Sequence, residues 1–304
     1  MRVVMTAPLL LGLLALSGVG HRWLDILFQF IAPVLLVTAI VTALLAVARL
    51  WTAVWQGLAA TVVLACAVTP QWFPASPAPR AGVPVVRLYS ANLWALNTDV
   101  EAITASVAAA NADVVVLVEL GDAPAARMDQ VLAGYPHRIA SPRVNRSSGA
   151  ARSVIASRWP LTLIRDRPDG LHAVGVTVRT PLGPLNVLGV HLTRPWPFQE
   201  QWGQISQTMA LGAVIADLEG PVIVAGDFNS VTSGRIGRQI RRDLGLHPAP
   251  GFPGTWPTAA PSAFAVTIDQ VYRSPDLAFV SRRLGLPTGS DHRPVVTELT
   301  LAAE

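Results

Sequence analysis

The chain has 304 residues, enough for one large domain or two smaller ones. Hydrophobic residues make up 51% of it and charged residues only 14%, and the mean hydropathy of +0.44 is high for a soluble protein. The formal net charge of +4 is too small to indicate nucleic-acid binding by itself, and the single cysteine, Cys66, excludes an intrachain disulfide and a multi-cysteine zinc site.

Three long uncharged runs occupy the N-terminal part of the chain, at residues 3–20, 26–48 and 50–68. Each is close to the ~20 apolar residues that a helix needs to cross the hydrocarbon core of a bilayer. The alternative is the buried helical core of a soluble domain, which three such runs in succession make less favoured. We therefore predict that residues 1–69 form a bundle of three transmembrane helices and bind a lipid bilayer.

The few charges around these runs predict their orientation. Arg2 and Arg49 would lie on one side of the membrane, whereas Arg22 on the other side is accompanied by Asp25. The positive-inside bias then places the N-terminus in the cytoplasm and the C-terminal domain on the extracytoplasmic side. The first run also resembles a signal peptide, and its removal would leave the domain on the same side. Residues 71–84 carry prolines at positions 74, 77, 79 and 84, which predicts a semi-rigid linker at 70–84 that holds the domain off the bilayer.

Strand and helix patterns alternate through residues 85–304, which we interpret as one catalytic domain. A Thr98–Glu101 capping box precedes an alanine-rich helix that would end near Asn111, and further helices are predicted at 124–133 and 199–218. A polar loop is expected at 143–152 and an irregular region at 245–261. Alternation of strands and helices indicates a layered α/β domain. The predicted strands are 85–89, 113–118, 153–157, 173–179, 185–190, 222–225, 266–272 and 294–299.

Most of these strands end in a side chain that can bind a cation or move a proton. After the buried run that stops at Gly226, for example, Asp227 and Asn229 would lie on one side of the chain. Singly, each such residue is explained by a turn or a helix cap. Together they supply oxygen ligands for a hard cation. Mg²⁺ prefers one or two carboxylates with several waters, which Glu119 and Asp291 could provide. The full set is Asn92, Glu119, His191, Asp227, Asn229, Asp269, Asp291 and His292.

The motifs around these residues resemble the signature blocks of the endonuclease/exonuclease/phosphatase superfamily. They are Val-Glu-Leu at Glu119, Gly-Val-His-Leu at His191, Gly-Asp-Phe-Asn at Asp227, Ile-Asp-Gln-Val at Asp269, and Ser-Asp-His-Arg-Pro-Val at His292. They occur in the family's order over about residues 85–302. The resemblance implies a four-layered α/β sandwich, two packed sheets with helices outside, and phosphoester hydrolysis assisted by a divalent cation, Mg²⁺ with Mn²⁺ as the alternative.

The resemblance also implies a role for each strand-end residue. Glu119 would bind the metal with help from Asn92 and Asp291, and Asp227 would orient or deprotonate the attacking water. Asn229, His191 and His292 would contact phosphoryl oxygens, and Asp269 would hold one of the histidines. Two positions depart from the family's pattern, because Trp94 and Gln270 stand where many members have other residues. The Trp94 difference leaves a second metal position open.

The substrate is less well indicated. The segment after His191 contains Arg194, Trp196 and Phe198. Arg194 could bind a second phosphate while Trp196 and Phe198 contact an apolar tail. The alternative is that the aromatic residues pack on the domain. Three spans, a linker and an external domain also resemble bacterial membrane proteins of this superfamily associated with glycopeptide resistance, which act on polyprenyl pyrophosphate. Our hypothesis is a multi-pass phosphohydrolase of the bacterial cell membrane that acts on a phosphorylated lipid or envelope substrate. The alternatives are a nuclease or phosphodiesterase and a catalytically silent binding module; nucleic acid is not the favoured partner, and no protein partner is inferred.

Overall fold

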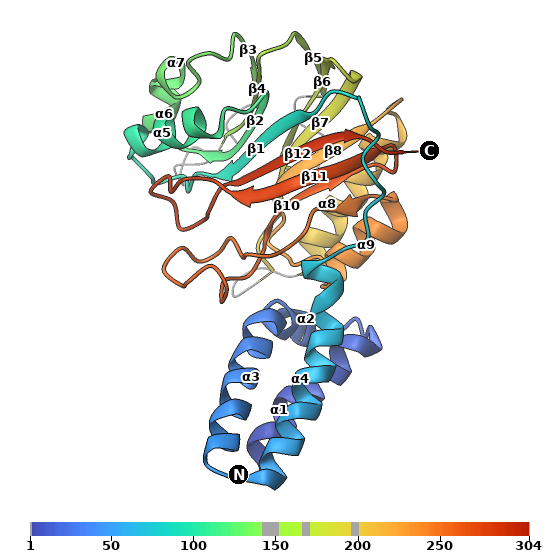
Figure 1. The fold of residues 1–304 in the computed structure, drawn as a ribbon. Helices are drawn as coiled ribbons and strands as arrows, with labels where there is room; N and C mark the ends of the chain where they lie inside the picture. The colour runs from blue at the N-terminus through green and yellow to red at the C-terminus, as the bar shows by residue number, and fades with distance from the viewer. Residues whose placement is uncertain (1, 142–151, 166–170, 196–200, 304) are drawn as a thin grey trace.

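The computed structural model describes residues 2–141, 152–165, 171–195 and 201–303, and Figure 1 shows a helical bundle below an α/β sandwich. Helices α1 and α3 pack against α4 in the bundle, and α2 lies between the bundle and the sandwich. The bundle's N-terminal end is its far end from the sandwich. Its helices are α1 (Arg2–Ser17), α2 (Arg22–Phe28), α3 (Ile31–Val47) and α4 (Trp51–Trp72).

The prediction of three spanning helices is not supported. The second apolar run is divided into α2 and α3, and α3 has only 17 residues. Among the described helices, α4 alone is long and apolar enough to cross a bilayer unaided, and α1 and α2 would add a second span only if this pair, bent by 112°, is counted as one. The length of the apolar run did not predict a single helix here, because the run contains a break after α2. Two polar side chains at α2, Asp25 and Gln29, bond to the sandwich instead of facing the bundle.

The sandwich confirms the expected α/β architecture. It contains two six-stranded mixed sheets, ordered β11-β12-β1-β2-β4-β3 and β5-β6-β7-β8-β10-β9. The first sheet comprises β1 (Val86–Asn92), β2 (Val114–Leu120), β3 (His137–Ala140), β4 (Arg152–Ser157), β11 (Leu277–Leu284) and β12 (Val295–Leu301). The second comprises β5 (Leu161–Arg165), β6 (Ala173–Thr180), β7 (Gly183–His191), β8 (Val222–Asp227), β9 (His247–Pro248) and β10 (Asp269–Arg273).

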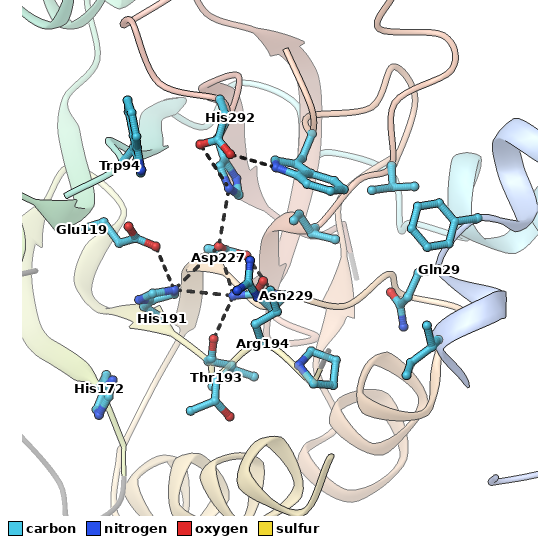
Figure 2. Close-up of a pocket in the computed structure, with 18 residues that line it drawn as sticks. Gln29, Trp94, Glu119, His172, His191, Thr193, Arg194, Asp227, Asn229 and His292 are labelled. Atoms are coloured by element: carbon cyan, nitrogen blue, oxygen red, sulfur yellow. Dashed lines mark hydrogen bonds and ion pairs between the residues drawn. The ribbon is translucent and has the colours of Figure 1, made fainter. Parts of the chain in front are cut away.

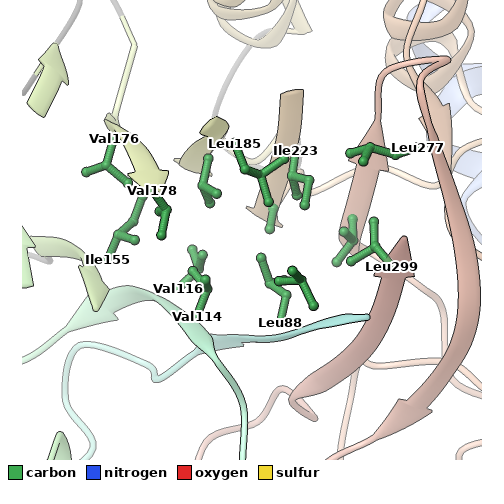
Figure 3. Packing of buried hydrophobic residues seen from close by; sticks show 14 of the residues in the cluster. Leu88, Val114, Val116, Ile155, Val176, Val178, Leu185, Ile223, Leu277 and Leu299 are labelled. Atoms are coloured by element: carbon green, nitrogen blue, oxygen red, sulfur yellow. The ribbon is translucent and has the colours of Figure 1, made fainter. Parts of the chain in front are cut away.

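The core lies between the two sheets, where aliphatic side chains of both inner faces interdigitate (Figure 3). The central strands are also buried on their outer faces, which explains why β2 and β8 are continuous apolar runs. Helix α5 (Val100–Ala110), with α6 (Asp122–Ala126) and α7 (Met128–Val131), covers the first sheet. Helices α8 (Gln201–Ala216) and α9 (Arg235–Leu244) cover the second. The four layers expected from the resemblance are therefore present.

Several local predictions need correction. The N-cap of α5 is Asp99, whose carboxylate accepts from the Ala102 N–H, so the Thr98 capping box is wrong. The helix predicted at 124–133 is broken into α6 and α7. Strands β3, β5 and β11 and helix α9 were not predicted. The helix predicted at 199–218 corresponds to α8, with its first two residues outside the described part of the chain, and almost all of the loop at 143–152 also lies outside it.

The bundle and the sandwich are joined by a set of buried hydrogen bonds, which we call the junction cluster: Asp25, Gln29, Gln71 and Gln201. Asp25 accepts from the backbone N–H of Arg235 at the start of α9 and from the Gln201 side chain. Gln29 accepts from the Val231 N–H at 2.7 Å, and Gln71 accepts from the Ser233 hydroxyl at 2.9 Å. The bundle and the sandwich are therefore in direct contact, and residues 70–72 of the predicted linker belong to α4.

Candidate active site

The strand-end residues meet because of how the strands pair. Strands β1 and β2 run parallel, as do β7 and β8, so their carboxyl ends emerge at one rim of the sandwich. The antiparallel partner β10 begins at this rim, which places Asp269 opposite Asp227 in the register. His292 lies in the turn that precedes β12, the antiparallel partner of β1. Seven of the predicted residues form a strand-end cluster: Asn92, Glu119, His191, Asp227, Asn229, Asp269 and His292.

Asp227 is at the centre of this cluster and is only 1% exposed. Its Oδ2 atom accepts from Asn92 Nδ2 at 2.9 Å and from Asn229 Nδ2 at 3.2 Å, and its Oδ1 accepts from the Asn229 N–H at 2.7 Å. Gly226 makes this geometry possible, because a Cβ there would lie 1.9 Å from the Val190 carbonyl oxygen and its φ is +142°. Both oxygens of Asp227 are thus fixed by neutral amides.

Glu119 reaches the cluster through an irregularity in β2. The register of β2 against β4 shifts between Leu117 and Leu120, and Glu119 adopts φ +52°, a left-handed conformation that is rare for a side chain of this kind. Its carboxylate accepts from Asn92 Nδ2 at 3.0 Å and from the Ala95 N–H at 3.2 Å. The bulge therefore re-aims a side chain that a regular strand would point elsewhere.

His191 and Asn229 lie on the other side of Asp227. The Nε2 atom of His191 is 3.1 Å from Glu119 Oε1 and 3.8 Å from Asp227 Oδ2. Asn229 has φ +47° and also donates to the Leu192 carbonyl at 2.9 Å. Since the Asn229 amide bonds Asp227 and the backbone, its position fits orientation of Asp227 more closely than the predicted contact with a phosphoryl oxygen.

His292 is held by a carboxylate, as the resemblance implied. Its Nδ1 lies 2.9 Å from Asp269 Oδ2. Its Nε2 lies 4.0 Å from Asp227 Oδ2, as Figure 2 shows. Asp291 lines the same pocket: its Oδ1 lies 3.9 Å from His292 Nε2, and its Oδ2 accepts from Trp256 Nε1 at 3.0 Å, with the side chain 53% exposed. Asp269 therefore orients the imidazole so that its second nitrogen faces Asp227.

Charge and burial perturb the pKa values of this cluster. Burial raises the pKa of Asp227 to about 6, against the opposing effect of His292. Burial alone would lower the pKa of His292, but Asp269 and Asp227 outweigh it and raise that pKa to about 10. Burial likewise opposes ionisation of Glu119, yet His191 and Asn92 bring its pKa below the usual value. Near neutral pH the cluster therefore combines a base poised to accept a proton with a protonated imidazole.

The donor set fits a hard divalent cation. Within the described residues, two groups hold ligand atoms within 4.8 Å of one another: Glu119 with His191 and Asp227, and Asp227 with Asp269 and His292. The second group is engaged internally, since Asp269 bonds His292, so Glu119 of the first group is the better candidate for a metal ligand. The two carboxylates of this group suit Mg²⁺ or Mn²⁺, and Asn92 faces them with its amide nitrogen, since its Oδ1 accepts from the Trp94 N–H. Asn92 lies beside this group, whereas the third predicted ligand, Asp291, is in neither.

A pocket of about 510 Å³ opens over the cluster. Arg194, predicted to bind substrate, lies along it and is exposed, and no ion pair joins Arg194 to another described residue. Trp94 also lines the pocket, with φ +56° and its N–H bonded to Asn92 Oδ1. Trp196 lies outside the described residues, so its predicted role has no structural counterpart here.

Sequence reasoning missed several pocket residues. Trp256, which bonds Asp291, comes from the irregular Gly/Pro-rich region, and Ile26, Gln29 and Phe30 come from the helical part of the chain. These residues approach the site through long-range contacts, and no local pattern marks them. Gln270, whose role was open, is buried and donates to the Thr267 carbonyl. It supports the loop that leads into β10.

Comparison with known proteins agrees with this geometry. The sequence profile described as the Endonuclease/Exonuclease/phosphatase family matches residues 89–292. No curated protein sequence matches the chain. Three solved structures share the fold: an endonuclease/exonuclease/phosphatase from Beutenbergia cavernae (22% identity, 72% of each chain covered, TM-score 0.55), one from Bacteroides vulgatus (14%, 72% of this chain and 99% of that one, 0.57), and the human Nocturnin catalytic domain with bound sulfate (15%, 77% and 100%, 0.53).

Proposed function

Because the chain belongs to the Endonuclease/Exonuclease/phosphatase family, we propose that it is a metal-assisted hydrolase of phosphoester or phosphoanhydride bonds. The family as a whole hydrolyses phosphoester bonds. The observation that carries the proposal for this chain is the convergence of two carboxylate–imidazole arrangements on Asp227, at the floor of one pocket. Phosphoryl transfer requires a positioned nucleophile and positive charge near the phosphoryl oxygens, and this cluster offers both.

Asp227 is the residue we assign to the attacking water. Its raised pKa of about 6 leaves it ionised at neutral pH yet basic enough to accept a proton. Asn92 and Asn229 hold its two oxygens in place, so the carboxylate needs no reorganisation as the water attacks. The two asparagines therefore act as positioning residues.

The imidazoles would contact the phosphoryl group. His292, kept protonated by Asp269, would donate from Nε2 to a phosphoryl oxygen of a substrate bound in the pocket. His191 would donate from the opposite side of Asp227. A divalent cation held by Glu119 would add positive charge to the phosphoryl oxygens and to the leaving group. Arg194 would bind a further phosphate where the substrate is a pyrophosphate.

We further propose that the bundle anchors the protein in the bacterial cell membrane, with the sandwich on the extracytoplasmic side. In support, most exposed large apolar side chains lie between Leu10 and Phe73, whereas soluble proteins rarely expose contiguous apolar surface of this extent. Exposed aromatic side chains, which prefer the membrane interface, occur along the bundle and on the sandwich elements that contact it. They are Trp23, Phe30, Trp51, Trp55, Phe73, Trp202 and Phe252. A phosphorylated lipid or envelope molecule is the substrate class that would reach such a site.

A phosphate-release screen of the detergent-solubilised full chain tests the function. Lipid phosphates, lipid pyrophosphates, sphingomyelin and DNA are compared at fixed Mg²⁺, with Asp227→Asn as the inactive control. We expect release from the lipid phosphates or pyrophosphates, abolished by EDTA. Cleavage of DNA alone, with a steep dependence on salt, would indicate a nuclease instead.

Protease treatment of intact cells tests the orientation. With an epitope tag at the C-terminus, we expect external protease to remove the tagged sandwich. A cytoplasmic reporter serves as the control for lysis. A sandwich protected in intact cells and cut only after permeabilisation would reverse the proposed topology.

A further inference from the structure

The pocket over the strand-end cluster has two chemically different ends. At one end Glu119, Asp227 and His292 present charge. Figure 2 shows Gln29 at the other end, beside the helical part of the chain. Its neighbours in the chain, Ile26 and Phe30, also line the pocket. The N-terminal helices therefore complete the pocket, and a molecule in it would touch both the sandwich and α2.

Two apolar side chains of the pocket lining, Val266 and Ile268, lie between the two ends. They form a buried cluster with Val231, which lies beneath the lining, and Trp256 packs against this cluster. Trp256 lies at the charged end, where its indole N–H bonds Asp291. Val231 lies at the helical end, where its backbone N–H bonds Gln29. A ligand that extends from the charged end therefore passes over carbon before it reaches α2.

The helical end offers little polar chemistry to a ligand. Gln29 is the polar side chain there, and it is only 8% exposed. Its oxygen accepts from Val231, and its amide nitrogen lies within bonding distance of Ser230 Oγ at 3.4 Å and of the Asp25 carbonyl at 3.2 Å. Since Gln29 is satisfied by the protein, Ile26 and Phe30 remain as the contact surface, and Phe30 is 39% exposed.

From this geometry we infer that the helical end is a subsite for the first segment of a hydrocarbon chain attached to the substrate's phosphate, and that Ile26 and Phe30 set the preference for it. The inference rests on the proposed phosphohydrolase function. A volume of about 510 Å³ is within the range of small-ligand pockets, so it holds a phosphate group and a few carbons. The remainder of a long chain would leave along the apolar bundle that α2 adjoins. A nucleoside would need hydrogen-bond donors and acceptors where this subsite presents carbon.

Chain-length dependence of hydrolysis tests the subsite. The full chain in detergent is assayed with monoalkyl phosphates from ethyl to octyl, each below its critical micelle concentration. Because the reacting group is the same throughout, kcat/KM is expected to rise two- to fourfold for each methylene that is buried and then to level off. Phe30→Ser is expected to flatten this rise, and Phe30→Leu to restore most of it.

Trp23→Ser is the matched control, since Trp23 is an aromatic residue of the same region, is 55% exposed and does not line the pocket. This variant should keep the wild-type dependence on chain length, and thermal melting should show that all three variants are folded. Equal kcat/KM for ethyl and octyl phosphate, or an unchanged slope in Phe30→Ser, would overturn the subsite while the phosphohydrolase function stands. Failure to hydrolyse any phosphate ester in the presence of Mg²⁺ would overturn both.

Discussion

Two buried polar clusters in this protein are each built around one carboxylate and differ in what surrounds it. In the junction cluster Asp25 is the single carboxylate, and it accepts from the Arg235 N–H and the Gln201 and Gln29 side chains, with the guanidinium charges of Arg235 and Arg238 also acting on it. In the strand-end cluster Asp227 lies near two further carboxylates, Asp269 and Glu119, and near two imidazoles. A buried carboxylate with matched donors stabilises a contact, whereas crowded carboxylates and imidazoles perturb each other's pKa values.

Backbone conformation separates the two clusters as well. Trp94, Glu119 and Asn229 of the active-site pocket have left-handed φ values, and none of the four junction residues does. Such conformations raise the free energy by about 1–3 kcal/mol each and persist where the surrounding structure imposes them. The comparison indicates that the junction cluster supports folding and that the strand-end cluster supports chemistry at some expense of stability.

The largest expected effect is a difference in kcat between variants of the two central carboxylates, Asp227 and Asp25. Asp227→Asn removes the proposed base while keeping its size, so we expect kcat to fall at least ~100-fold with an unchanged fold by circular dichroism. Asp25→Asn, at the centre of the junction cluster, is the matched variant and should lower kcat far less. An equal fall in kcat in the two variants would contradict the view that one cluster serves catalysis and the other serves folding.

The reverse asymmetry is expected for stability. Asp25→Ala leaves the Arg235 N–H and the Gln201 amide without their acceptor, so we expect the free energy of unfolding to fall by about 1–3 kcal/mol. For Asp227→Asn the free energy of unfolding should fall by less, or rise, because this substitution removes a buried charge near Asp269. Chemical denaturation in detergent measures both, and a larger loss for Asp227→Asn would contradict the comparison.

Metal dependence sharpens the assignment of Glu119. In Glu119→Gln the proposed ligand loses its charge, and we expect the Mg²⁺ concentration for half-maximal activity to rise about tenfold. Glu101→Gln, which changes an exposed surface carboxylate paired with Arg127, is the control. A wild-type Mg²⁺ titration in Glu119→Gln would remove this residue from the metal site.

The smallest effect is a displacement of the pH profile. Activity should rise with pH as Asp227 loses its proton near pH 6, and fall as His292 loses its proton near pH 10. Asp269→Asn removes a carboxylate that raises the pKa of His292, so the alkaline limb should move to lower pH. An alkaline limb that stays in place would show that another group controls it.

Part of this structure was predictable because it depends on short segments. Continuous apolar runs marked β2 and β8 as buried strands, and the residues that follow them, Glu119 and Asp227, do reach the same pocket. Helix α9 was missed although Ile236 and Ile240 have helical spacing, so that signal was present. Strand β11 also has partly alternating residues, which were not recognised.

The sequence alone determined which polar residues end the strands and that the N-terminal region is apolar, because both follow from local periodicity and composition. Only the tertiary structure decided that Asp269 holds His292, that Asn92 bonds Asp227 and that Asp291 bonds Trp256. It also decided that Asp25 and Gln29 turn α2 onto the sandwich and close the pocket. These contacts join residues far apart in the chain, and a buried polar group takes whichever partner the packed layers bring within bonding distance.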